Sequence, residues 1–222
     1  MIDLRPLGDR AFLARFDDVD AARGWASTAR SRGWPGVDVV LAYATVAVHA
    51  EPDRVDLDDL EAGLRGLDFG PSTAPEASSF ELPVLYDGED LGPVASALNM
   101  AVDPLIRLHS SMVYEVQAVG FLPGFPYLGD LPAPLRGLAR REVPRAAVPA
   151  GSVAIVGRQS CVYPASSPGG WHLIGRTPLR IVDVDSGYFP IRAGDQVRFR
   201  PIDFEEYQAR SGERLSPIEA IG

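Results

Sequence analysis

Alternating and helically spaced apolar positions divide the first part of the chain into short strands and amphipathic helices. Alternation predicts strands at 10–16 and 37–50, and the second of these is long enough to contain a turn. Helical spacing predicts helices at 19–33 and 53–67. This combination is typical of a small α+β sandwich, so we expect a ferredoxin-like domain, or one close to it, at residues 1–70.

The pattern stops at a segment rich in Pro, Ser, Ala and Thr. Residues 71–79 carry no periodic apolar positions and are predicted to be a linker. We therefore expect a second domain at residues 80–222.

The second domain begins with mixed elements and continues as a mainly β chain. We expect a strand at 80–87 and helices at 89–100 and 103–111, with Asp103 as the N-cap of the second helix. Short β-rich runs separated by Gly and Pro then follow at 112–121, 151–157, 160–164, 179–184 and 195–202. Such runs are typical of a barrel or sandwich. The segment GFLPGFPYLG at 120–129 is too rich in Gly and Pro for a helix or a central strand, so we expect an apolar loop there.

Composition excludes several classes of function. With 222 residues and 46% hydrophobic content the chain can bury a core, and its net charge of −9 argues against a nucleic-acid-binding protein. The sequence contains no lysine. This excludes a Walker A lysine, a Schiff-base lysine and a biotin-carrying lysine from this chain.

Cysteine content and hydropathy give two further expectations. Cys161 is the single cysteine and there are three histidines, so neither a disulfide nor a metal site is expected. No stretch approaches the roughly 20 apolar residues of a membrane span, and residues 1–9 lack the features of a signal peptide. We expect a soluble, cytoplasmic protein.

Two features of the second domain suggest an anion-binding site. Residues 136–145 contain Arg136, Arg140, Arg141 and Arg145 but only one acid. Guanidinium groups suit carboxylate or phosphate ligands, and the segment 168–170, Pro-Gly-Gly, is a candidate for a backbone anion nest. The alternative interpretation is solvated surface arginines and turn-forming Gly and Pro.

Single side chains give weaker signals. His109, at the end of a predicted helix, is a candidate acid, base or phosphate ligand. His172 is a weaker candidate, and His49 fits an ordinary surface position. Cys161 lies in a β-rich run, which favours a packed thiol over a nucleophile.

Three motifs in order resemble a known family. They are HSSMVYEVQAVGFLPGFPYLGDLP, PRAAVPAGSVAIVGRQ and YPASSPGGWHLIGRTP. Together they are similar to the family of 5-oxoprolinase B subunits, also called allophanate hydrolase subunit 1, the carboxyltransferase domain subunit or the KipI family. The resemblance extends from RPLGDRAFLARF at 5–16 to GDQVRFRPID at 194–203.

The resemblance implies a fold and an activity. It implies an N-terminal ferredoxin-like α+β domain followed by a cyclophilin-like β-barrel. The implied activity is that of one subunit of an ATP-dependent 5-oxoprolinase, which opens the lactam of 5-oxoproline to L-glutamate.

The resemblance also implies partners and a cofactor. The expected partners are a related cyclophilin-like barrel protein, called the C subunit or allophanate hydrolase subunit 2, and a lactam-binding protein, called the A subunit. The expected cofactor is ATP with Mg, and no biotin is carried on this chain. The open alternatives are a KipI-like inhibitor of histidine kinase autophosphorylation and half of a urea carboxylase or allophanate hydrolase carboxyltransferase module.

Matching positions give the candidate site. The resemblance assigns catalytic roles to His109 and Arg145. It assigns substrate or nucleotide binding to Tyr114, Phe121, Pro123, Gly124, Phe125, Tyr127, Gln159, Tyr163, Pro168, Gly169, Gly170 and Trp171. Cys161 departs from the small residue expected there, which weakens a nucleophile role further.

Overall fold

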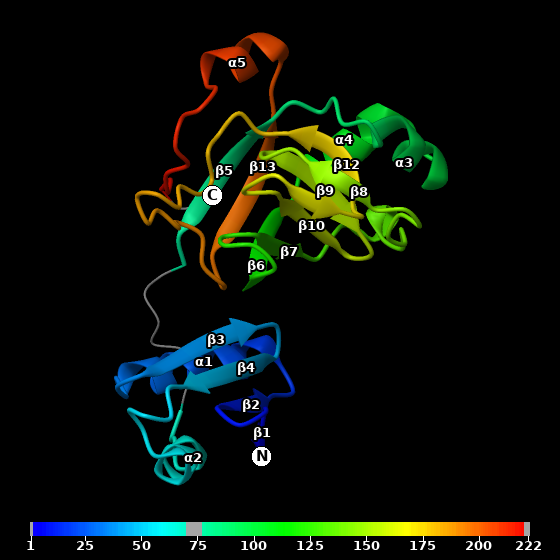
Figure 1. Cartoon of the computed structure of the whole chain (residues 1–222). Coiled ribbons are helices and arrows are strands. Elements are labelled where there is room, and N and C mark those ends of the chain that lie inside the picture. The colour runs from blue at the N-terminus through cyan, green and yellow to red at the C-terminus, as the bar shows by residue number, and fades with distance from the viewer. Residues whose placement is uncertain (1, 70–76, 220–222) are drawn as a thin grey trace. The chain divides into compact units, whose positions relative to one another are not determined.

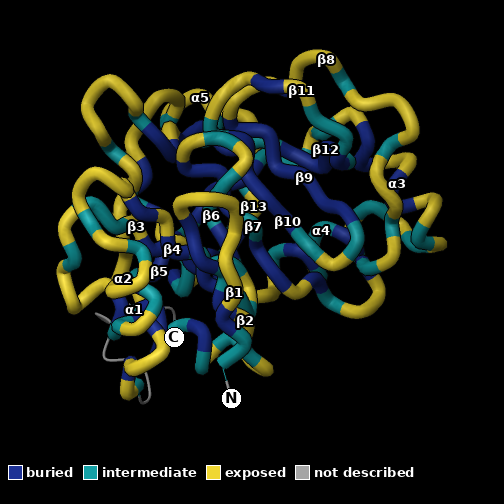
Figure 2. The backbone as a smooth tube through the Cα atoms, turned by 60° about the horizontal axis from the view of Figure 1, so that its bottom comes forward, coloured by how far each residue is buried: buried dark blue, intermediate teal, exposed yellow. Residues whose placement is uncertain are grey.

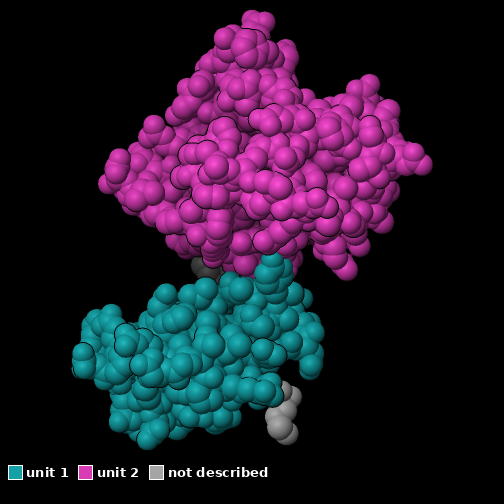
Figure 3. All heavy atoms as spheres, turned by 45° about the vertical axis from the view of Figure 1, so that its right-hand side comes forward, with its two compact units in different colours: residues 1–76 teal, residues 77–222 magenta. Residues whose placement is uncertain are grey.

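The structure, a computed structural model, describes residues 2–69 and 77–219, which belong to two compact units, residues 1–76 and 77–222 (Figure 3). The predicted linker at 71–79 lies largely outside the described residues, and Ser79 is already the first residue of a strand. Among the described residues, no helix is long and apolar enough to cross a membrane.

Unit 1 is a four-stranded antiparallel sheet with two helices (Figure 1). Its elements are β1 (Asp3–Pro6), β2 (Ala11–Arg15), α1 (Val19–Ser31), β3 (Val37–Ala42), β4 (Thr45–Ala50) and α2 (Leu57–Arg65). The strand order β1-β2-β4-β3 places β4 antiparallel to both β2 and β3, so α1 connects two parallel strands around it. The predicted strands and helices of this region are confirmed, and β1 is an additional strand that the pattern did not indicate.

The helices of unit 1 follow from local sequence. The side chains of Asp18 and Asp56 cap the first turns of α1 and α2 by accepting hydrogen bonds from backbone N–H groups. Trp25 of α1 is buried, as are Val46 and Val48 of β4. These apolar faces give the unit its own core.

Unit 2 is built around a mostly antiparallel sheet that closes on itself. Its strands are β5 (Ser79–Val84), β6 (Val113–Val119), β7 (Pro126–Gly129), β8 (Arg145–Val148), β9 (Ser152–Val156), β10 (Gln159–Val162), β11 (Ser167–Gly169), β12 (His172–Arg176) and β13 (Gln196–Pro201). The order is β5-β13-β6-β7-β10-β9-β12, with only β5 and β13 parallel among these pairs. Leu85 and Arg176 exchange two backbone hydrogen bonds of 2.9 Å, which join the β5 end of this order to β12.

The remaining elements lie outside this closed sheet. They are α3 (Leu91–Ala97), α4 (Val102–Ser110), the 3₁₀ turn η1 (Ala133–Leu135), α5 (Phe204–Ala209) and the β8–β11 pair. The predicted helices at 89–100 and 103–111 correspond to α3 and α4. The N-cap prediction is wrong, because Ala101 is the N-cap of α4 and Asp103 lies inside its first turn.

Two strand predictions in unit 2 are also wrong. Residues 126–129, expected to be loop, form β7, which pairs with β6 and β10 in the middle of the sheet. Residues 179–184, expected to be a strand, make only isolated bridges at Arg180 and Asp183. Leu179, Ile181 and Val182 are nevertheless buried, so their apolar character reflects core packing without strand pairing.

Alternation along β9 and β10 separates two apolar clusters. Val153 and Ile155 join Val162 in the large cluster on one side of the sheet. Ala154 and Val156 join Cys161 in a second cluster on the other side. Figure 2 shows the central strands, including β9, as buried backbone. Alternate residues of β10 therefore point to opposite sides of the sheet, toward one or the other of the two apolar clusters.

Candidate functional site

An aromatic pocket of about 250 Å³ lies against the second cluster of unit 2. It is lined by Phe121, Phe125, Tyr127, Arg140, Pro144, Tyr163, Pro168, Gly169, Gly170 and Trp171. The pocket brings together the 120–129 segment, the arginine-rich segment and the Pro-Gly-Gly segment. Eight of the residues carried over from the family resemblance therefore share one site.

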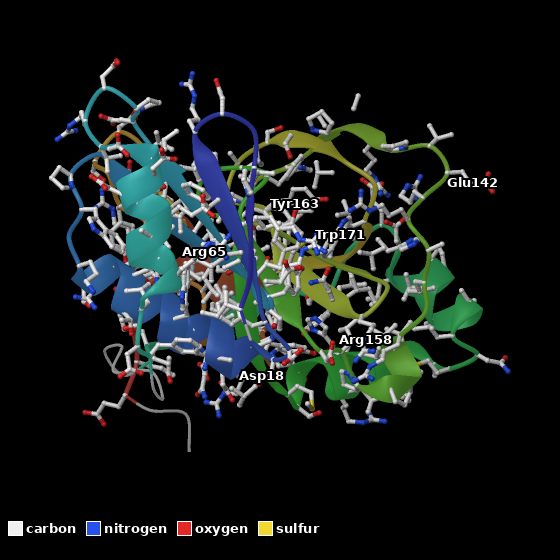
Figure 4. All side chains as sticks on the ribbon, turned by 90° about the horizontal axis from the view of Figure 1, so that it is seen from below. Asp18, Arg65, Glu142, Arg158, Tyr163 and Trp171 are labelled. Atoms are coloured by element: carbon white, nitrogen blue, oxygen red, sulfur yellow. The ribbon has the colours of Figure 1, made fainter. Side chains whose placement is uncertain are left out.

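Phe125 is the centre of the aromatic wall. Its ring centroid lies 5.5 Å from Phe121, 5.0 Å from Tyr127, 5.2 Å from Tyr163 and 6.0 Å from Trp171. All four contacts are of the edge type, which aromatic pairs prefer. Tyr163 and Trp171 are labelled in Figure 4, where they lie near one another. The rings support one another and leave an apolar wall around the pocket.

A tight turn presents these rings. Phe125 N–H donates to the Leu122 carbonyl at 3.0 Å, and Pro123 and Gly124 are the two central residues of the turn. Gly124 has φ +73°, and a Cβ there would collide with Val182. Pro123 and Gly124 do not line the pocket, so their contribution is to shape the loop that places Phe121 and Phe125.

The arginine cluster divides between the pocket and an ion-pair network. Asp90 accepts hydrogen bonds from Arg141 and Arg145 at 2.9 Å each and from the Leu173 N–H at 2.7 Å. Burial alone would raise the pKa of Asp90, but the hydrogen bonds from Arg145 and Leu173 outweigh it and hold this pKa below its usual range. Arg145 also pairs with Glu89 at 3.0 Å.

Arg145 is thus a partner of carboxylates in its own chain and is not among the residues that line the pocket. The structure gives no support to its expected catalytic role. Arg140 lines the pocket instead, with Pro144. Glu142, between them in sequence, is exposed and points outward in Figure 4.

The Pro-Gly-Gly segment has the backbone of a strand edge. Gly169 belongs to β11, and neither Gly169 nor Gly170 has the left-handed φ of an alternating anion nest. The carbonyl of Gly170 accepts the Arg141 N–H at 2.9 Å. A Cβ on Gly169 would collide with the Tyr163 hydroxyl, so this glycine permits close packing. The nest prediction is wrong.

His109 lies on the opposite side of the sheet from the pocket. It is 0% exposed and stacks on Phe199 at 4.5 Å between ring centroids. Ser160 donates to the Ala154 carbonyl, so its oxygen is left to accept from His109 Nε2–H at 2.9 Å. Nδ1 then accepts from the Tyr86 hydroxyl at 2.8 Å.

This environment makes His109 a neutral residue of the core. Burial lowers its pKa to about 3. Tyr114 is also fully buried, and its hydroxyl donates to the His109 carbonyl at 2.8 Å. Neither residue lines the pocket, so the structure gives no support to a role for them in proton transfer, phosphate binding or substrate binding.

The other singled-out side chains lie elsewhere. Burial raises the pKa of Cys161 well above its usual value, which does not suit a nucleophile. His172 Nε2 donates to the Ala139 carbonyl at 2.8 Å. His49 is an exposed residue of β4 in unit 1. Gln159 is on β10, paired with Gly129, and does not line the pocket.

The pocket also contains two residues that the family resemblance did not select, Arg140 and Pro144. Arg140 was one of four candidates in a charged cluster, and sequence alone gave no way to tell which of the four arginines form ion pairs with carboxylates.

Within residues 2–69 and 77–219, no group of His, Cys, Asp and Glu has the arrangement of a metal site.

Comparison with known proteins assigns the family. The family described as carboxyltransferase domain, subdomain C and D, matches residues 2–189, and the chain belongs to it. The chain is similar to proteins that are named as the B subunit of 5-oxoprolinase. It is 44% identical to the one from Escherichia coli O157:H7 over 154 residues, covering 68% of this chain and 70% of that protein. It is 39% identical to the one from Haemophilus influenzae over 168 residues, covering 74% and 76%.

A solved structure is also similar to this chain in sequence and in fold. The crystal structure of TTHA0988 is 37% identical with a TM-score of 0.76, and the match covers 87% of this chain. The chain spans only 40% of the TTHA0988 chain.

Proposed function

We propose that this protein is one subunit of an ATP-dependent 5-oxoprolinase complex, which opens the lactam of 5-oxoproline to L-glutamate. The observation that carries the proposal is the 44% and 39% identity to the B subunits of 5-oxoprolinase, in each case over more than two thirds of both chains. The names of these relatives also indicate an assembly with other subunits.

The chemistry of ring opening explains the need for ATP. Transfer of the ATP γ-phosphoryl group to the lactam oxygen makes the carbonyl carbon electrophilic. Water then adds to that carbon, and the ring nitrogen takes up a proton as the C–N bond breaks, which leaves an acyl phosphate. A second water hydrolyses the acyl phosphate to the carboxylate of glutamate and inorganic phosphate. Mg bound to ATP would stabilise the charge on the phosphates.

The residues that line the pocket support a catalytic role that this chain shares with other subunits. Among the described residues that line it there is no carboxylate, histidine or cysteine. The titratable side chains that line it are Arg140, Tyr127 and Tyr163, and we propose that further acid–base groups for ring opening come from other subunits. We propose as partners a related cyclophilin-like barrel protein, the C subunit, and a lactam-binding protein, the A subunit.

The finer fold assignment and the location are part of the same proposal. The two parallel strands of unit 1 around β4 support a ferredoxin-like domain, and the closed sheet of unit 2 supports a cyclophilin-like barrel. A complex that consumes ATP would work in the cytoplasm.

The test is reconstitution. The chain is co-expressed with candidate A and C subunits, and release of ADP and glutamate is measured with and without 5-oxoproline. We expect lactam-dependent ATP hydrolysis from the complete complex and none when this chain is omitted. A folded, complete complex that shows no such turnover would refute the proposal and favour a KipI-like inhibitor, which is tested by autophosphorylation of a histidine kinase.

A further inference from the structure

The aromatic pocket has walls suited to a small flat ring. Phe125 lies nearly perpendicular to Phe121, Tyr163 and Trp171, with interplanar angles of 83°, 87° and 90°. A ligand in this pocket would meet the faces and edges of these rings together with Pro144 and Pro168. Aromatic surfaces favour offset-stacked or edge contacts with a flat partner.

Phe121 is held at this pocket at a conformational cost. Its φ is +73°, a region that residues other than glycine seldom adopt, and its side chain is 64% exposed. The ring contacts Phe125 at 5.5 Å but stays mostly exposed, so little of its apolar surface is buried within this unit. Strained residues of this kind are concentrated at binding sites.

Arg140 supplies the single positive charge of the pocket. Among the residues that the structure describes, its guanidinium has no ion-pair partner, in contrast to Arg141 and Arg145. Burial raises the pKa of Tyr163, while the Trp171 backbone and the charge of Arg140 act against the rise. The guanidinium therefore lies close enough to act on the phenol group of Tyr163.

Size and charge narrow the class of ligand. About 250 Å³ is below the roughly 300–1,000 Å³ of sites for drug-sized ligands. A nucleoside triphosphate would bring several negative charges to a pocket with one cation, and the anion nest expected at 168–170 is not formed. The pocket suits a metabolite with one carboxylate and a small apolar or planar body.

From these features we infer that the pocket binds a small cyclic amide that carries a carboxylate, with 5-oxoproline as the ligand. Arg140 holds the carboxylate through paired N–H donors, and the flat lactam lies against Phe125 and Trp171. The inference rests on the proposed function and extends it, because it gives this chain a lactam site of its own and leaves ATP to another site in the complex.

Binding to the full-length chain tests the inference directly. The chain is titrated with 5-oxoproline by calorimetry and by tryptophan fluorescence, to which Trp171 contributes together with Trp25 and Trp34. We expect saturable binding, weakened about 10- to 100-fold by Arg140→Gln because a charged hydrogen-bonding partner is lost. The lactam 2-pyrrolidinone, which lacks the carboxylate, should bind more weakly and be insensitive to Arg140→Gln.

A matched variant controls for net charge. Arg107 is an exposed arginine of α4 that does not line the pocket, so Arg107→Gln removes the same charge and should leave binding unchanged. Circular dichroism confirms that both variants are folded. Absence of saturable binding, or equal affinity of wild type and Arg140→Gln, would overturn the inference, as would competition by Mg-ATP for the same site.

The two proposals fail separately. If the reconstituted complex hydrolyses ATP with 5-oxoproline but the chain shows no Arg140-dependent binding, the pocket inference is wrong and the proposed function stands. If the chain binds 5-oxoproline through Arg140 but the complete complex has no turnover, the ligand of the pocket stands and the proposed function is wrong. In an active complex, Arg140→Gln should raise KM for 5-oxoproline without changing KM for ATP.

Discussion

Replacing Asp90 by alanine should destabilise unit 2 by about 3–5 kcal/mol, the range found when one partner of a buried ion pair is removed. The side chains of Asp90 and Arg145 are only 7% and 14% exposed. Asp90 accepts from Arg141, Arg145 and the Leu173 N–H, so the substitution leaves three donors without this acceptor.

Little in the surroundings can replace the lost carboxylate. Arg141 Nε and Arg145 Nη1 already lack a hydrogen-bond partner among the described residues. Glu89 still pairs with Arg145, but its side chain is 75% exposed and its attraction is weakened by solvent. The expected loss in the free energy of unfolding therefore comes from a buried charge that is left unpaired. Asp90→Asn keeps one acceptor oxygen and should lower the free energy of unfolding less than Asp90→Ala does.

The assay is urea unfolding followed by circular dichroism and by tryptophan fluorescence. The matched control is Asp87→Ala, which removes the Asp87–Arg176 pair, 2.7 Å long with side chains 40% and 43% exposed. An exposed pair contributes about 0–1 kcal/mol. If Asp90→Ala and Asp87→Ala lower the free energy of unfolding by the same amount, the reasoning about burial is wrong.

Four further predictions concern the core and the pocket. The pKa of His109 is about 3 in the folded state and about 6.5 in the unfolded state, so the unfolded state binds the proton first as the pH falls. The free energy of unfolding should therefore fall by about 2 kcal/mol from pH 7 to pH 5, and by less in His109→Gln. Gly169→Ala should lower the free energy of unfolding by about 1–3 kcal/mol and reduce ligand affinity, because the new Cβ meets Tyr163; a variant as stable as wild type would contradict this. Phe121→Ala should change the free energy of unfolding by less than about 0.5 kcal/mol but weaken 5-oxoproline binding, since the ring is exposed at the pocket; unchanged affinity would argue against its role as a wall. Cys161 should react with a thiol reagent only after unfolding, and fast labelling of the native chain would contradict its place in the core.

Sequence patterns predicted the helices and strands that bury one face. They missed a strand that forms because other strands, separate from it in sequence, pair with it. The helix at 19–33 and the strands within 37–50 each show a clear apolar period, and both are present. The segment 126–129 carries Pro and Gly, which oppose a strand locally. Its neighbours β6 and β10 nevertheless pair with it on both sides, a tertiary effect that no local pattern contains.

The candidate site was predictable in its aromatic part and not in its charges. Phe125, Tyr163 and Trp171 come from two separate motifs, and the structure places them in contact. The arginine cluster was visible as a cluster, but Arg145 lies beside Asp90, 55 residues away in sequence, and that pairing removes it from the pocket. Only three-dimensional proximity decides which arginine is left for a ligand.

The strand β10 explains why the histidine and the pocket belong to different parts of the molecule. Ser160 faces the large core, where it accepts the hydrogen bond from His109, while the next residue, Cys161, packs in the cluster beneath the aromatic wall. Because side chains alternate across a strand, the hydrogen bond to Ser160 holds His109 of α4 on the side of β10 that faces away from the pocket. The titratable side chains that line the pocket are Arg140, Tyr127 and Tyr163, and the proposal that further acid–base groups come from partner subunits follows from this separation.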